Sequence, residues 1–170
     1  MPRESQPEKT ATITVSPVLV LGVGNTLMSD DGVGVRLVER LQSLEPTLPG
    51  VEYLDAGTLS FVLLPRIQEC SALLVLDAAR LDEPPGAVRS FTGAAMDEFL
   101  RTARCSVHEV GIRDLLDLAR LTGTLPAHRG FIGIQPGSTG WGEELSPAVA
   151  AALPRAVEQA RMLLVDWCRE

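Results

Sequence analysis

The sequence predicts one α/β domain in three layers, with a twisted and mostly parallel sheet that is covered by helices on both faces. Two observations support this fold class. The runs at residues 18–21 and 71–78 are apolar almost throughout, as in strands that are buried on both faces. Between such runs lie segments whose apolar residues recur at helical spacing. At 170 residues the chain is long enough for one substantial core, and we expect about five strands.

The first strand, at residues 18–21, leads through a glycine-rich turn into a helix whose apolar pattern runs over residues 33–44. Two aspartates stand just before that helix. We expect Asp30 to cap the helix, because Asp is a preferred N-cap residue. Asp31 fits two roles about equally well. It complements the helix dipole, or it projects into the crevice at the carboxyl end of the sheet.

The remaining elements follow in order along the chain. A short strand at 51–55 precedes a helix at 59–67, in which Pro65 weakens the pattern. The strong apolar run at 71–78 predicts a central strand. An alternating edge strand at 87–91, which we expect to be antiparallel, and one helical turn at 96–100 come next. An amphipathic helix at 108–121, a buried strand at 130–136 and a final helix at 147–167 follow.

The composition argues against several functions. A formal net charge of −7 opposes a surface for nucleic acid or for anionic membrane. No apolar run is long enough to span a membrane. The polar segment 1–16 predicts a disordered tail, followed by a single domain at 17–170. Three scattered cysteines favour reduced thiols over a disulfide framework or a structural zinc site. We therefore expect a cytoplasmic protein, and we also expect it to be a monomer, although the sequence does not decide its oligomeric state.

Four polar residues stand where predicted strands end or a predicted helix begins: Asp31, Asp55, Asp77 and His108. Parallel strands end at one edge of a sheet, so these side chains form a candidate site. The carboxylates of Asp31 and Asp77 with the imidazole of His108 suit nickel, zinc, cobalt or cadmium, with positions left for water or substrate. Taken singly, each residue has a structural alternative. Asp77 and His108 could be caps, and Asp55 could accept a hydrogen bond in an Asx-turn.

Other site patterns are incomplete. A dinucleotide-binding turn needs a third glycine where this chain has Leu27, and the two aspartates that follow would repel a phosphate. Cys105 lies three residues before His108 and could act as a thiol nucleophile, an option that we rank below the carboxylates. We expect His128 to be an exposed loop residue.

Five segments resemble those of the hydrogenase maturation peptidases, which process the large subunit of [NiFe] hydrogenases. They occur in that family's order and spacing and span most of the chain after the first residues. They are GVGNTLMSDDGVGVRLVERL (22–41), VEYLDAGT (51–58), LLVLDAAR (73–80), SVHEVGIRDLLDLARLTG (106–123) and FIGIQP (131–136), the last followed by LSP (145–147).

The resemblance implies an endopeptidase that removes a C-terminal extension from the hydrogenase large-subunit precursor after nickel insertion. It implies that Asp31, Asp77 and His108 contact the metal and serve catalysis, although some members of the family carry Glu at the position of Asp31. It also implies a functional carboxylate at Asp55. We expect the nickel to belong to the substrate, with zinc or cadmium able to replace it in vitro. The class of peptidase, aspartic or metallo, stays open.

The residues suggest how such an enzyme would work. The chain has no obvious nucleophile, so we expect water to attack, while the bound nickel registers the scissile bond. One alternative is a nickel-sensing chaperone that binds the precursor without cutting it. Others are a nucleotide-binding domain and a metallopeptidase that keeps its own metal. Trp141, in a glycine-rich loop, is a candidate contact for the precursor or packs on its own domain.

Overall fold

The computed structural model describes residues 18–58, 61–102 and 107–169, and in these ranges the chain forms one five-stranded sheet. The strand order is β2-β1-β3-β5-β4. β1, β2, β3 and β5 are parallel, and β4 pairs antiparallel with β5 at one edge. The strands are β1 (Val18–Val23), β2 (Val51–Gly57), β3 (Ala72–Ala78), β4 (Val88–Thr92) and β5 (His128–Ile134). The predicted fold class is confirmed. The predicted tail at 1–16 lies outside the described residues.

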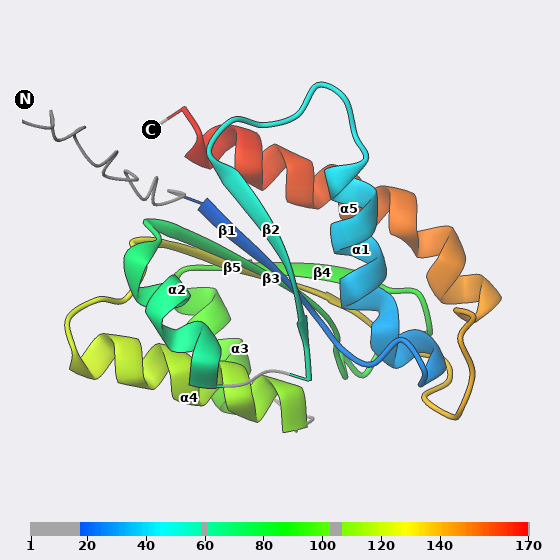
Figure 1. The fold of residues 1–170 in the computed structure, drawn as a ribbon. Helices are drawn as coiled ribbons and strands as arrows, with labels where there is room; N and C mark the ends of the chain where they lie inside the picture. The colour runs from blue at the N-terminus through cyan, green and yellow to red at the C-terminus, as the bar shows by residue number, and fades with distance from the viewer. Residues whose placement is uncertain (1–17, 59–60, 103–106, 170) are drawn as a thin grey trace, which may run out of the picture.

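Helices cover both faces of the sheet (Figure 1). One face carries α1 (Val33–Gln42) and α5 (Pro147–Trp167), and the other carries α2 (Leu64–Glu69), α3 (Ala94–Thr102) and α4 (Val107–Leu121). Two short 3-10 helices, η1 (Ser29–Gly32) and η2 (Phe61–Leu63), precede α1 and α2. Within the described residues, no helix combines the length and the apolar character that crossing a membrane would need.

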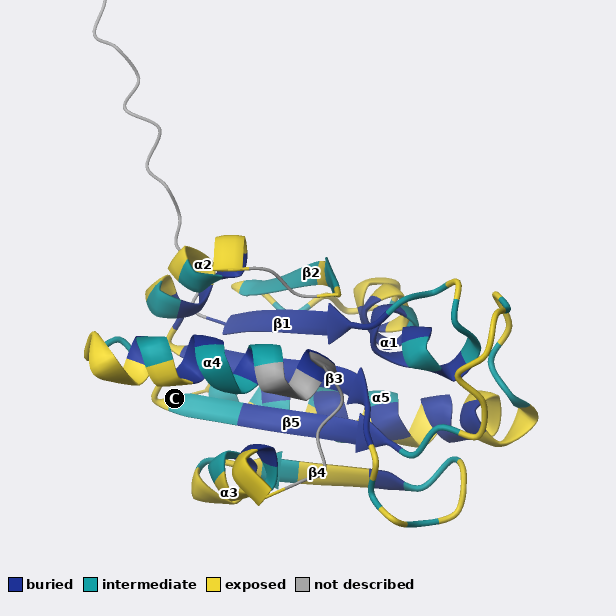
Figure 2. Ribbon diagram, turned by 90° about the horizontal axis from the view of Figure 1, so that it is seen from below, coloured by how far each residue is buried: buried dark blue, intermediate teal, exposed yellow. Residues whose placement is uncertain are grey.

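The core lies in two layers, one on each side of the sheet. Val18 and Val20 of β1 point toward α1 and α5, whereas Leu19 and Leu21 point toward the other helices. The same alternation runs through β3, which is buried along its whole length. Figure 2 shows this arrangement: β1 and β3 are buried throughout, and the two edge strands are more exposed. Burial on both faces explains why these strands lack polar alternation.

The elements differ from the predicted ones mainly at their ends. Of the helix predicted at 59–67, residues 59–60 lie outside the described residues. The rest forms η2 and then α2, because Pro65 fits only the first turn of a helix. The single turn predicted at 96–100 is the longer helix α3. β5 begins at His128, two residues before the predicted start, and ends before Gln135 and Pro136. Since proline has no N–H, it cannot extend the ladder.

Close packing of α1 against the sheet positions the turn that follows β1. A Cβ atom on Gly34 would lie 2.1 Å from the carbonyl oxygen of Leu76 in β3, and one on Gly22 would lie 2.5 Å from the carbonyl oxygen of Gly34. Only glycines allow this approach. The start of α1, and η1 just before it, are therefore held directly over the carboxyl ends of β1 and β3.

Candidate active site

Three of the predicted site residues meet at the carboxyl edge of the sheet. Asp31 lies in η1, in the connection after β1, and Asp77 is the next-to-last residue of the neighbouring strand β3. His108 lies in the first turn of α4. Its Nδ1 is 3.8 Å from Oδ1 of Asp31 and 3.7 Å from Oδ1 of Asp77. The structure thus brings together two carboxylates and an imidazole that are far apart in the sequence.

Strand alternation explains the direction in which Asp77 points. Leu73 and Val75 of β3 pack into the layer that also contains residues of α4, and Asp77 is the next residue on that face. α4 lies against this layer through Ile112 and its neighbours on the same helical face. The first turn of α4 therefore places His108 on the same face of the sheet as the side chain of Asp77.

Asp77 is the buried carboxyl group of the site. It is fully buried, and within the described part of the chain neither of its carboxylate oxygens makes a hydrogen bond of ordinary length. Burial raises the pKa of Asp77 to about 6, although the nearby imidazole of His108 acts to lower it. A buried carboxylate without close donors is costly for folding, and such groups are typical of functional sites.

Asp31 is held differently. Its Oδ2 accepts a hydrogen bond of 2.9 Å from the backbone N–H of Asn25, so the chain preceding η1 orients the carboxylate. Its Oδ1 is the oxygen nearest His108. The side chain is 23% exposed, whereas that of Asp77 is closed off. Asp31 therefore forms the solvent-facing side of the trio and Asp77 its floor.

The metal-binding prediction concerns this trio, whose donor types suit a borderline divalent cation. As they stand, the described side chains include no group of three or more His, Cys, Asp or Glu residues arranged to hold a metal ion. The donor atoms of the trio thus lie near one another without forming a complete coordination site. Its role in metal binding and catalysis stays a prediction.

Asp55 lies on β2, two strands away from the strand that carries Asp77. It is an exposed residue near the end of the edge strand β2, and its Oδ1 accepts a hydrogen bond of 2.8 Å from the N–H of Gly57. This is the Asx-type contact that the sequence allows as its structural role. Among the described residues, Asp55 has no hydrogen bond or ion pair with the trio. The predicted catalytic role of Asp55 stays a prediction.

The expectation that Asp30 caps the helix is wrong. The residue is fully buried, the N-cap position of α1 is occupied by Gly32, and neither η1 nor α1 has a side-chain cap. Its carboxylate accepts four hydrogen bonds of 2.7 to 2.9 Å, from the backbone N–H groups of Gly137, Ser138 and Ser146 and from the hydroxyl of Ser146. Burial alone would raise the pKa of Asp30, but these hydrogen bonds outweigh it and lower the pKa.

Asp30 thus ties η1 to the loop between β5 and α5. This role was not predicted from the sequence, where its only signal is two adjacent carboxylates and a distant loop rich in glycine and serine. Adjacent residues on a tight turn point to different sides, so Asp30 faces the loop while Asp31 faces His108.

Two further expectations can be compared with the structure. His128 is not an exposed loop residue, because it opens β5, is half-buried and has its ring 6.1 Å from that of Trp167. Trp141 does not pack on its own domain, since its side chain is 85% exposed. Cys105, which we ranked below the carboxylates as a possible thiol nucleophile, lies outside the described residues.

Comparison with known proteins identifies the family. The model of the family described as hydrogenase maturation protease matches residues 35–162. The hydrogenase expression/formation protein HoxM of Cupriavidus necator is 37% identical over 151 residues, which cover 88% of this chain and 75% of that protein. The hydrogenase 2 maturation protease of Escherichia coli is 34% identical over 143 residues, covering 84% of this chain and 87% of that protein.

The fold agrees with the sequence match. The solved structure of the hydrogenase maturating endopeptidase HybD from E. coli superimposes with a TM-score of 0.82 at 33% identity, covering 88% of this chain and 92% of that one. The residues that match the family model include Asp77 and α4, and the comparisons do not favour a nucleotide-binding domain. The chain therefore belongs to the hydrogenase maturation protease family and is a peptidase.

Proposed function

We propose that the protein is an endopeptidase that removes a C-terminal peptide from the nickel-loaded large-subunit precursor of a [NiFe] hydrogenase. The observation that carries the proposal is the meeting of Asp31, Asp77 and His108 at the carboxyl edge of the sheet. This edge is where open α/β sheets bind their ligands. The family match supplies the class of reaction, and the trio supplies the place where the metal of the precursor would be recognised.

The geometry of the trio supports recognition of a metal that arrives with ligands of its own. Two donor atoms bound tetrahedrally at about 2.0 to 2.1 Å from one ion lie roughly 3.4 Å apart. The distances from Nδ1 of His108 to the two carboxylates exceed this by only a few tenths of an ångström. Three side chains that do not close a cage leave coordination positions for groups of the substrate.

We infer the following course of the reaction. Asp31, Asp77 and His108 bind the nickel of the precursor, which fixes the scissile peptide bond at the open side of the site. A water molecule attacks the peptide carbonyl carbon, the C–N bond breaks, and the new amine takes up a proton. Without nickel the peptide is not held in register and is not cut. Asp55 would assist from the end of β2.

The proposal also covers the setting of the reaction. We place the protein in the cytoplasm as a monomer. Among the described cysteines, Cys70 and Cys168 are free thiols, which fits a reducing compartment. Zinc or cadmium, with similar ligand preferences, would occupy the same donors in vitro.

Mass spectrometry of the precursor tests the proposal. A nickel-loaded and a nickel-free precursor are each incubated with the protein, and with its His108→Ala variant as the control. Loss of a C-terminal peptide only from the loaded form, and only with the unaltered protein, is the expected result. Tight binding without a change in mass would instead establish the nickel-sensing chaperone. Cleavage of both forms would remove nickel as the trigger, and cleavage of unrelated peptides would indicate a self-sufficient metallopeptidase.

A further inference from the structure

Two exposed apolar side chains stand beside the candidate site, on two segments that are distant in the sequence. Leu27 is 50% exposed and Trp141 is 85% exposed. The backbone joins their segments through a parallel bridge between Met28 and Gly142. Ser29 N–H donates to the Gly142 carbonyl at 2.6 Å, and Gly142 N–H donates to the Leu27 carbonyl at 3.0 Å. In Figure 1 the turn after β1 and the loop before α5 lie side by side.

The backbone around both residues is braced. Leu27 N–H donates to the side-chain oxygen of Asn25 at 3.0 Å, and Asn25 N–H donates to Asp31. The loop that carries Trp141 is fastened near both its ends by the buried carboxylate of Asp30. Exposed aromatic and aliphatic side chains on a fixed backbone contribute little to the fold. They lose little conformational entropy when a partner covers them, which suits a binding surface.

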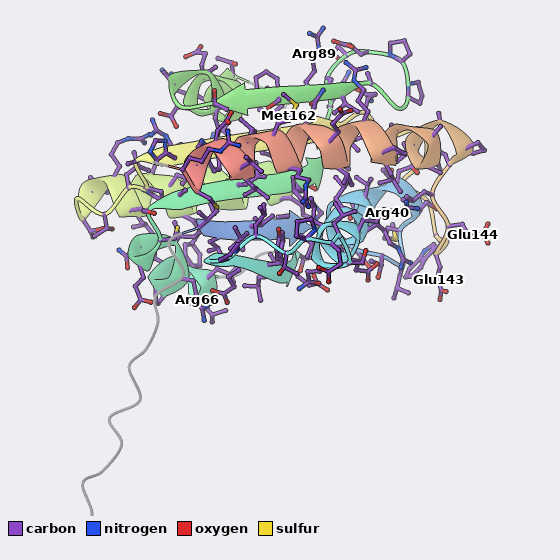
Figure 3. All side chains as sticks on the ribbon, turned by 90° about the horizontal axis from the view of Figure 1, so that it is seen from above. Arg40, Arg66, Arg89, Glu143, Glu144 and Met162 are labelled. Atoms are coloured by element: carbon purple, nitrogen blue, oxygen red, sulfur yellow. The ribbon has the colours of Figure 1, made fainter. Side chains whose placement is uncertain are left out.

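The charge next to these side chains indicates the chemistry of the partner. Glu143 and Glu144 follow Trp141, are exposed, and extend away from the body of the molecule (Figure 3). Neither carboxylate forms an ion pair with a described residue. The chain also has a formal net charge of −7. A complementary partner surface would therefore offer apolar side chains flanked by lysine or arginine.

From these observations we propose that Leu27 and Trp141 form the docking surface for the hydrogenase large-subunit precursor. The surface receives an apolar segment of the precursor with basic residues beside it. The inference rests on the proposed function. It adds that the polypeptide is bound by one surface and its nickel by another, since Leu27 lies on the same turn as Asp31 without belonging to the trio. Docking contributes affinity that does not depend on nickel.

Steady-state processing of the nickel-loaded precursor tests this surface. The test variant is Leu27→Ala/Trp141→Ala. The matched control is Leu121→Ala/Met162→Ala, which truncates two exposed apolar side chains at the end of α4 and on α5 (Met162 is labelled in Figure 3). We expect the test variant to raise KM at least tenfold with kcat within twofold, and the control to change neither.

A second pair of variants tests the charge. Glu143→Gln/Glu144→Gln and Glu158→Gln/Asp166→Asn both remove two negative charges from exposed positions, the second pair on α5. Only the first pair should slow association with the precursor, by roughly threefold or more at low salt, and the difference should shrink at high salt. Equal effects of the two pairs on the association rate would show that only the net charge of the protein matters, which contradicts a local docking surface.

Trp141 fluorescence measures docking directly. In a Trp167→Phe variant, Trp141 is the remaining tryptophan. Its emission should shift to shorter wavelength on addition of the nickel-loaded precursor, and also of the nickel-free precursor. No shift with either form would overturn the docking surface.

The outcomes separate the two proposals. An unchanged KM in the test variant overturns the docking surface while leaving the peptidase intact. A lower kcat at unchanged KM also overturns it, because the residues would then act by holding the turn of Asp31. If the variant changes a dimer into a monomer in sedimentation without affecting KM, the surface binds a second copy of the chain instead. If the unaltered protein binds the precursor but never cuts it, the proposed function is overturned. The docking surface is then tested by comparing the Kd of the precursor for the unaltered protein with its Kd for the Leu27→Ala/Trp141→Ala variant.

Discussion

Nδ1 of His108 lies 3.7 Å from Oδ1 of Asp77, and this pairing joins the buried end of a central strand to the first turn of a helix on the sheet's outer layer. Asp77 is fully buried, with a pKa raised to about 6. The protein thus keeps a carboxylate where an uncharged side chain would be easier to bury. This cost leads to the first prediction.

Replacing Asp77 with Asn is expected to stabilise the fold and abolish processing. The folded-state pKa is raised from 3.8 to about 6, so the folded protein prefers the neutral form. Stability is therefore lost as pH rises from about 4 to 6, and above that range the charge costs up to about 3 kcal/mol. At pH 7.5, Asp77→Asn should raise Tm by as much as roughly 6 to 12 °C. Calorimetry from pH 4 to 8 measures it, and a Tm difference that does not vary with pH would contradict this origin.

The same substitution should have different effects on stability at the two adjacent aspartates. Asp30→Asn places an amide among four donors, and we expect a loss of about 3 kcal/mol in the free energy of unfolding. Asp31→Asn keeps an acceptor for the N–H of Asn25, so its stability should change by less than about 1 kcal/mol while processing is lost. Urea denaturation and the processing assay are run on both variants, and similar stabilities would show that the buried carboxylate does not brace the loop.

The loop held by Asp30 should loosen in acid. The pKa of Asp30 is lowered, so its contribution to stability is present above about 3.8 and is lost as pH falls through the lowered value. Hydrogen exchange at residues 137–146 should accelerate more than in β3 over that pH range, after correction for intrinsic rates. Equal changes in the loop and in β3 would indicate global unfolding instead.

Asp55→Asn separates catalysis from structure at the end of β2. The amide oxygen of Asn can still accept the hydrogen bond from Gly57 N–H, so we expect the same Tm within about 1 °C. If the carboxylate takes part in the reaction, kcat should fall at least tenfold. An unchanged kcat would leave Asp55 as a turn residue.

Gly34→Ala tests the close approach of α1 to the sheet. The new Cβ would lie 2.1 Å from the Leu76 carbonyl oxygen, so α1 must shift. We expect a destabilisation of about 2 to 4 kcal/mol, together with slower processing because η1 moves with the helix. Gly140→Ala is the matched control, since its nearest neighbour is the Ser138 hydroxyl oxygen at 3.9 Å. A comparable loss in both variants would indicate a general effect of replacing glycine.

Much of this structure follows from patterns that are local in the sequence. The continuous apolar character of residues 71–78 predicts β3 as a central strand, because burial on both faces leaves no room for polar alternation. The grouping of Asp31, Asp77 and His108 follows from parallel topology, which places the ends of β1 and β3 at one edge. These features need no knowledge of distant contacts.

Features that depend on distant contacts were not predictable from local patterns. Asp30 and Asp31 have identical side chains, and only the direction of η1, together with the N–H groups of a loop more than one hundred residues away, assigns them different roles. The burial of His128 depends in the same way on Trp167, near the end of α5. No periodicity within either segment carries that information.

The tie between Asp30 and Ser146 has a consequence for the newly made chain. It joins residues 116 positions apart, and α5, which completes the layer over α1, follows Ser146 directly in the chain. Until Ser146 and α5 have been synthesised, the turn that carries Asp31 lacks its brace and one face of the sheet lacks part of its cover. The turn that carries Asp31 therefore reaches its braced geometry only once the loop before α5 is in place.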